Sequence, residues 1–177
     1  MATDGIIEVP GLILIIMCLL RSAQYVVQSQ SKQSRYFWLA SVLVFFAVIR
    51  RELNYLPDLL IPSDFSLLGH SYDWWEDSVL TVIYLLIVGL LIYSWRYLKA
   101  VLKDVDVSLY VIVVLLAIIQ YMGENAIVFP YAAGGIIEEL AETAIYGIAL
   151  LYLWKFKLAA FENSSVKPNF DTQRKST

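Results

Sequence analysis

Five long apolar runs constrain the fold of this chain more than any other feature. A helix that crosses a membrane needs about 20 mostly apolar residues. Runs of that length lie at about 6–27, 36–56, 74–97, 107–129 and 133–155. We therefore predict an all-α fold, a polytopic membrane helix bundle with five transmembrane helices. The bundle takes up residues 1–157, and a polar tail follows at 158–177.

The composition supports this prediction. Hydrophobic residues make up 59% of the 177 residues and charged residues only 16%. A soluble domain usually carries about 25% charged residues. Disordered chains have low hydrophobicity and high net charge, the reverse of what is found here. The composition therefore excludes both an ordinary soluble globule and a disordered chain.

The charges lie asymmetrically along the chain and predict an orientation. With the N-terminus outside, the loops at 28–35 and 98–106 and the C-terminal tail all fall on the cytoplasmic side. That side, with the span ends nearest to it, then carries 11 of the 13 basic residues, and the outer side carries 12 of the 16 acidic residues. Basic residues gather on the cytoplasmic side of membrane proteins. We expect an outside N-terminus and a cytoplasmic C-terminus.

The five tryptophans fit the same layout. Trp38, Trp95 and Trp154 fall at expected inner ends of spans, and Trp74 and Trp75 fall at an outer end. Tryptophan is enriched where a bilayer meets water. We expect all five indole rings to lie at the two membrane surfaces.

Cysteine and histidine are too scarce for several kinds of site. The single cysteine, Cys18, excludes an intrachain disulfide framework and a four-cysteine metal site. The single histidine, His70, excludes paired haem ligands and histidine-rich iron clusters. We therefore expect no haem and no iron–sulfur cluster. The basic residues follow the predicted membrane topology and leave no separate surface for nucleic acid.

Polar and charged residues gather in the outer third of the predicted spans. An ionisable group at membrane depth is costly and is by default a sign of function. Helical spacing puts Glu138 and Glu142 on one face of the last span, and Gln120 and Glu124 on one face of the fourth. The full set comprises Glu8, Arg50, Arg51, Glu52, Asn54, Asp73, Glu76, Asp77, Gln120, Glu124, Asn125, Glu138, Glu139 and Glu142.

Three interpretations of this acidic cluster are open. In the first, Arg50 and Arg51 neutralise some carboxylates, protonation neutralises others, and the network packs the helices. The second is a site for a divalent cation with oxygen ligands, such as Mn²⁺, Mg²⁺ or Ca²⁺. The metal candidates are Glu124, Glu138, Glu139 and Glu142.

The third interpretation is recognition of a lipid head group or a partner in the outer leaflet. An arginine pair is suited to hold a phosphate. A carboxylate nearby could act as a base. The candidate residues for lipid or partner binding are Arg50, Arg51, Glu52, Asn54, His70, Asp73 and Asp77.

The connection at 57–73 combines chain breaks with apolar patches. Pro57, Pro62 and Gly69 interrupt it, and leucines and a phenylalanine lie between them. An amphipathic loop at the membrane surface is one interpretation, and a lid over the acidic cluster is the other. His70, close to Asp73, is the one side chain here whose ordinary pKa lies near neutrality.

Two short motifs carry a resemblance to known proteins. Arg51-Glu52-Leu53-Asn54 and Glu138-Glu139-Leu140-Ala141-Glu142 resemble the R-E-x-[D/N] and E-E-x-x-E elements of small polytopic bacterial inner-membrane proteins of unknown function. The paired glutamates also resemble those of CAAX-type intramembrane proteases. That family requires an arginine where this chain has Thr143, and histidines on other helices, so its activity is not expected here.

The sequence leaves two classes of function open. The first is a non-enzymatic accessory or assembly component of a membrane complex, whose acidic cluster packs helices or binds a cation or partner. The alternative is a membrane-embedded enzyme or transporter that uses the outer carboxylates with Arg50 and Arg51 on a lipid head group or cation. Five short spans leave little room for a transport path, and no nucleophile–base set is complete, which favours the first class. Membrane lipids, other membrane subunits or further copies of the chain are the expected partners.

Overall fold

The computed structural model describes residues 4–53, 66–67, 69–125, 127 and 130–166. In this part of the chain nearly all residues are helical, and two two-residue strands form a small antiparallel ladder in which Leu67 pairs with His70. The elements are α1 (Asp4–Gln28), α2 (Lys32–Glu52), β1 (Ser66–Leu67), β2 (His70–Ser71), α4 (Tyr72–Tyr93), α5 (Trp95–Asp104), α6 (Val107–Glu124), α7 (Tyr131–Lys155) and α8 (Leu158–Val166). The prediction of an all-α bundle is confirmed.

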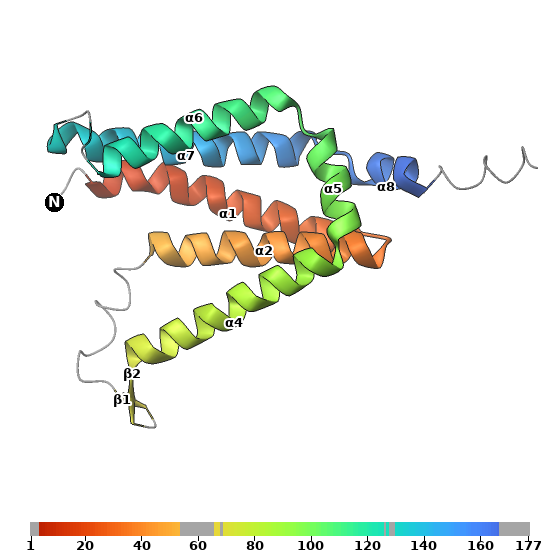
Figure 1. Ribbon diagram of the computed structural model, residues 1–177, viewed down its shortest axis with the longest axis horizontal. Helices are drawn as coiled ribbons and strands as arrows, with labels where there is room; N and C mark the ends of the chain where they lie inside the picture. The colour runs from red at the N-terminus through yellow and green to blue at the C-terminus, as the bar shows by residue number, and fades with distance from the viewer. Residues whose placement is uncertain (1–3, 54–65, 68, 126, 128–129, 167–177) are drawn as a thin grey trace, which may run out of the picture.

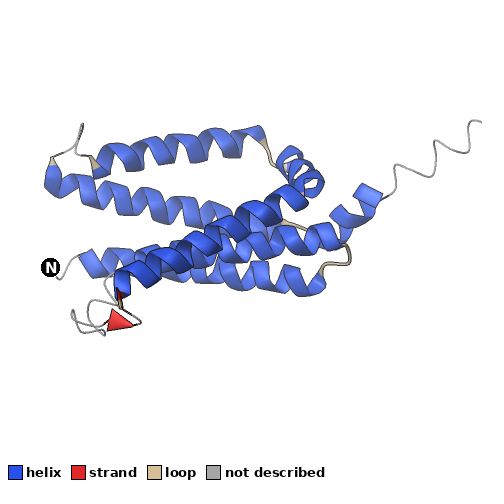
Figure 2. Cartoon of the chain, turned by 60° about the horizontal axis from the view of Figure 1, so that its bottom comes forward, coloured by secondary structure: helices blue, strands red, loops and turns tan. Residues whose placement is uncertain are grey.

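The helices pack side by side in the order α6, α7, α1, α2, α4, with α4 and α6 at the two edges (Figure 1). Helix α5 joins these two edge helices at one end of the bundle, which we call the α5 end. The start of α1 and the end of α2 lie at the opposite end, which we call the N-terminal end (Figures 1 and 2). Side chains from α2, α4, α6 and α7 can therefore meet at the N-terminal end.

Three of the described helices are long and apolar enough to cross a membrane. They cover Val9–Gln28 in α1, Trp74–Tyr93 in α4 and Val107–Glu124 in α6. Helix α2 carries charges at both ends and α7 carries three glutamates in its first half, so their apolar runs are shorter. These three helices support the prediction that the chain is a membrane protein.

Helices α4 and α6 expose apolar side chains that water would not tolerate in such numbers. On α4, the exposed fraction is 67% for Leu85 and 69% for Ile92. On α6, Val111, Leu115 and Ile118 are likewise exposed. Large exposed apolar patches mark surfaces that meet another molecule or a membrane. The exposed apolar faces of α4 and α6 are consistent with a membrane protein.

An aromatic core fills the α5 end of the bundle. The rings of Tyr25, Trp38 and Phe156 pack against one another, with centroids 4.6 Å apart for Tyr25 and Trp38. The Trp38 indole nitrogen donates a hydrogen bond of 3.3 Å to the hydroxyl of Tyr97, and only 2% of Trp38 is exposed. Trp38 is therefore buried inside the protein at the α5 end, where its ring packs on Tyr25, Phe37 and Phe156. The placement of all five tryptophans at the membrane surfaces stays a prediction.

The Tyr25 hydroxyl ties α1 to the end of α7. It lies 2.6 Å from the carbonyl oxygen of Leu153 and 2.7 Å from that of Phe156. The two carbonyl oxygens share the single proton that the hydroxyl donates. The last carbonyls of a helix have no partner within the helix. Replacing Tyr25 by Phe should lower the free energy of unfolding by about 1–2 kcal/mol. Thermal melting in detergent measures this, and Tyr36→Phe, at a tyrosine whose ring packs on Tyr93, is the matched control.

The expected span 74–97 is two helices in the structure. Helix α4 ends at Tyr93, and the Ser94 hydroxyl donates a 2.7 Å hydrogen bond to the carbonyl of Leu90 at the junction. The segment expected to be a loop at 98–106 mostly belongs to α5. Tyr97 and Val101 share its buried face. The basic side chains of α5 are exposed, the pattern of a helix that lies along a membrane surface.

The first part of the expected polar tail is also helical. Helix α8 buries Leu158 in the aromatic core, and the ring of Phe161 packs on Tyr97. Glu162 is buried, and one of its carboxylate oxygens accepts a 3.3 Å hydrogen bond from the backbone nitrogen of Gln30. Residues 158–166 therefore extend the bundle, and residues 167–177 lie outside the described part of the chain.

Candidate functional site

Glu142 is the centre of a polar cluster at the N-terminal end of the bundle. Its side chain is 7% exposed, and one carboxylate oxygen accepts hydrogen bonds from Arg51 of α2 and Gln120 of α6. Glu142 itself belongs to α7, one turn from Glu138. A single buried carboxylate thus joins three helices that are far apart in sequence.

Two further contacts extend this cluster. The Tyr146 hydroxyl on α7 donates a 3.0 Å hydrogen bond to the carboxylate of Glu52 on α2. Arg50, the neighbour of Arg51, forms an ion pair with Glu76 of α4. The term polar cluster is used below for the residues that these contacts join: Arg50, Arg51, Glu52, Glu76, Gln120, Glu142 and Tyr146.

The polar cluster shares two arginines among three carboxylates. Arg50 pairs with Glu76, and Arg51 lies between Glu142 and Glu52, whose oxygen is 3.5 Å away. Neutral donors supply the remaining contacts, because Gln120 bonds to Glu142 and Tyr146 to Glu52. Buried carboxylates are tolerated when such donors satisfy them. The contacts of Arg51, Glu52, Gln120, Glu142 and Tyr146 thus join α2, α6 and α7, and the separate Arg50–Glu76 pair joins α2 to α4.

The four glutamates proposed as metal ligands are only partly brought together. Glu138 lies within electrostatic range of Glu124, while Glu142 is engaged by Arg51 and Gln120. Glu124 is exposed at the last residue of α6, and Glu139 is half-buried on α7. Within the described ranges, no group of three or more His, Cys, Asp or Glu side chains is close enough to hold a metal ion. The cation site stays a prediction from the sequence.

The residues predicted for lipid or partner binding have different outcomes. Arg50, Arg51 and Glu52 belong to the polar cluster, and Asp77 is exposed on α4. Asn54 and residues 55–65 lie outside the described residues, so the lid proposed over the cluster has no structural description here. The backbones of His70 and Asp73 are placed in β2 and α4, but their side chains are outside the described part.

Three members of the polar cluster are missing from the predicted metal ligands and from the predicted lipid-binding or partner-binding residues. They are Glu76, Gln120 and Tyr146. Helical spacing is the signal that finds two of them, since Gln120 precedes Glu124 by one turn and Tyr146 follows Glu142 by one turn. Glu76 shows no such pattern, and only the packing of α4 on α2 reveals its partner.

Two glycines set how closely α6 and α7 approach beside the cluster. A Cβ atom added to Gly123 of α6 would lie 2.7 Å from the carbonyl oxygen of Gly134 and 3.1 Å from the backbone nitrogen of Glu138. Helix backbones come this close only where small residues face each other. The contact brings Gln120, one turn before Gly123, within reach of Glu142.

Comparisons with known proteins give no further constraint on this site. No protein-family model, no curated protein and no solved structure matches the chain.

Proposed function

We propose that this chain is a non-enzymatic accessory or assembly component of a membrane complex. In this proposal the polar cluster locks α2, α4, α6 and α7 together at the N-terminal end of the bundle. The observation that carries it is Glu142, a buried carboxylate whose donors come from two other helices. In this proposal the locked bundle offers a fixed surface to a larger partner.

The network geometry favours packing over chemistry. Arg50 and Arg51 each form an ion pair with a carboxylate on another helix. Polar side chains that bond across helices help membrane bundles to associate. Both features support a cluster that fixes helix positions and leave the membrane enzyme or transporter as the weaker alternative.

The assembly role has a direct test in native membranes. After solubilisation in a mild detergent, the chain should migrate on a native gel in a particle larger than a detergent-bound 20.2 kDa monomer. Chemical cross-linking before solubilisation should preserve the same particle. A chain that runs only as a monomer in both experiments contradicts the assembly role.

We also propose that all five long helices cross a bacterial inner membrane, with the N-terminus outside. Helix α2 has 21 residues and α7 has 25, so each extends more than about 30 Å, the thickness of the hydrocarbon core. Both lie alongside α1, one of the helices that is apolar enough to span (Figure 1). This layout puts α5 at the cytoplasmic surface and the polar cluster in the outer half.

Cysteine labelling tests this topology. With Cys18 replaced by Ala, single cysteines at Ser31 and Lys103 should react with a membrane-impermeant maleimide only from the cytoplasmic side. Cysteines at Gly69 and Asn125 should react only from the outside. Native Cys18 is fully buried, so its removal should not change the labelling pattern. Labelling of Ser31→Cys and Asn125→Cys from the same side would contradict five spans.

A further inference from the structure

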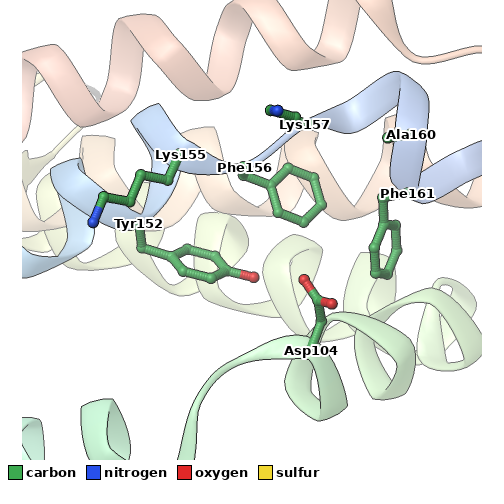
Figure 3. Close-up of a pocket in the computed structure, with 7 residues that line it drawn as sticks. All are labelled: Asp104, Tyr152, Lys155, Phe156, Lys157, Ala160 and Phe161. Atoms are coloured by element: carbon green, nitrogen blue, oxygen red, sulfur yellow. The ribbon is translucent and has the colours of Figure 1, made fainter.

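A second site lies at the α5 end of the bundle, far from the polar cluster. A pocket of about 410 Å³ opens there between α5, α7 and α8 (Figure 3). Its lining residues are Asp104, Tyr152, Lys155, Phe156, Lys157, Ala160 and Phe161. It combines one carboxylate, two ammonium groups, a phenol and two aromatic rings within one small space.

The two signs of charge are separated across this pocket. The Asp104 carboxylate and the Tyr152 hydroxyl point toward each other, with the rings of Phe156 and Phe161 beside them (Figure 3). The side chains of Lys155 and Lys157 stand at the edge, away from Asp104 (Figure 3). The Tyr152 hydroxyl is buried, and among the described residues it has no hydrogen-bond partner. A buried hydroxyl without a partner is unusual and calls for an explanation.

An apolar cavity adjoins the pocket. It has a volume of about 220 Å³ and is formed by α2, α4, α5 and α7. Tyr152 lines both spaces, so its ring is a wall that they share. On α5, Val101 lines the cavity and Asp104, one turn later, lines the pocket. Besides Trp38 and Tyr152, the one polar residue of the lining is Ser41, whose hydroxyl donates a hydrogen bond to the carbonyl of Phe37.

The cavity has the length of a lipid tail in one leaflet. Along α2 it is lined from Phe37 to Phe45, which is about 12 Å at a rise of about 1.5 Å per residue. Half of a bilayer's hydrocarbon core is about 15 Å thick. Farther toward the N-terminal end, Arg51 of α2 and Glu142 of α7 belong to the polar cluster. The cavity therefore suits one acyl chain of a lipid that enters from the α5 end.

We infer that this double cavity binds an aminophospholipid of the inner leaflet. Its ammonium group lies between Asp104, the Tyr152 hydroxyl and the two phenylalanine rings, and its phosphate lies near Lys155 and Lys157. One acyl chain occupies the apolar cavity. A carboxylate and aromatic faces together attract an ammonium group. A lipid with only negative charge would meet Asp104 unfavourably, so charge complementarity selects the zwitterionic head group.

This inference rests on the membrane topology proposed above and not on the assembly role. The test uses the full chain purified in detergent and given equal amounts of phosphatidylethanolamine and phosphatidylglycerol, with native mass spectrometry to count retained lipids. The wild type should retain phosphatidylethanolamine in preference. Asp104→Asn should lower this preference about fivefold. Equal retention of both lipids by the wild type, or of neither, overturns the inference.

Matched variants separate the tail from the head group. Ala149 lines the apolar cavity, and Ala149→Leu fills it and should reduce retention of both lipids. Ala144→Leu makes the same change at an exposed position of α7 and should leave retention unchanged. Lys103→Ala, beside Asp104 but outside the lining residues, is the control for a change in surface charge. An unchanged phosphatidylethanolamine preference in Asp104→Asn counts against the head-group assignment.

A cross-linking experiment does not depend on the stability of any variant. Phosphatidylethanolamine with a photoreactive group in its acyl chain should label peptides from α2 and α7 around Ser41 and Ala149. Labelling confined to the exposed faces of α4 and α6 would show general lipid contact and overturn the cavity assignment. If the photoreactive lipid labels α2 and α7 but the chain runs only as a monomer on the native gel, the assembly role is refuted and the lipid site is not.

Discussion

Replacing Glu142 by Gln should lower the free energy of unfolding by about 2 kcal/mol, a typical contribution of a hydrogen bond to a charged group. The change keeps the shape of the side chain and removes its charge. Arg51 then loses the closer of its two carboxylate partners and keeps Glu52 at 3.5 Å, while Gln120 faces an amide in place of a carboxylate. Thermal unfolding in detergent measures the loss. Asp77→Asn, at an exposed carboxylate of α4, is the matched control and should change little.

A double variant shows whether the pair packs helices or holds a ligand. Replacing both members of a buried ion pair by apolar residues is often neutral or stabilising, whereas removing one member leaves a buried charge without its partner. In this pair Glu142 is the buried member, with 7% of its side chain exposed, and 65% of the Arg51 side chain is exposed. Arg51→Met and Glu142→Leu should each destabilise the bundle, and together they should recover much of the loss. If Glu142→Gln instead leaves stability unchanged but strips a divalent cation seen by elemental analysis, the packing role is wrong and the cation site is supported.

Gly123→Ala should be among the most destabilising small substitutions in the chain. The added Cβ would lie 2.7 Å from a backbone oxygen of Gly134, and backbone cannot move aside as a flexible side chain can. Forcing extra atoms into a packed contact costs about 1–3 kcal/mol. The melting temperature should fall, and Gln120 should shift away from Glu142. Because α6 packs on the bundle through α7, the whole helix is expected to move.

The chain offers close controls for this contact. A Cβ atom added at Gly89 on α4 or at Gly135 on α7 meets nothing within 4 Å. Alanine at either position should leave the melting temperature unchanged or raise it slightly, since alanine favours a helix more than glycine does. Gly135 lies next to Gly134, the residue that Gly123 contacts. Comparing Gly123→Ala with Gly135→Ala therefore separates the effect of helix propensity from the effect of helix contact. Equal effects of Gly123→Ala and Gly135→Ala would contradict the close approach.

Local patterns predicted much of the helical layout. Apolar runs of the right length located α1, α2, α6 and α7 closely, because a helix needs little beyond its own residues to satisfy its backbone. They missed the break at Ser94, since a hydroxyl that bonds back to Leu90 leaves no mark on hydropathy. They also missed α8, whose burial depends on a core built by residues more than a hundred positions earlier, such as Tyr25.

The candidate site divides in the same way. Helical spacing and charge were enough to indicate a cluster that includes Arg51, Glu52 and Glu142. They could not assign partners, because the choice of Glu76 for Arg50 and of Glu142 for Arg51 depends on which helices are neighbours. The pocket at Asp104 and Tyr152 could not be predicted from the sequence, because its lining residues come from separate helices.

The sequence by itself determined that the chain is helical, that it is too apolar for water, and that its carboxylates gather toward one end of the helices. Each of these follows from residue type and from periods of a few residues, which act along a single helix. The tertiary structure decided which side chains meet. Ion pairs, glycine contacts and cavities join residues distant in sequence, and their positions depend on helix order and on distances of a few ångströms that no local pattern specifies.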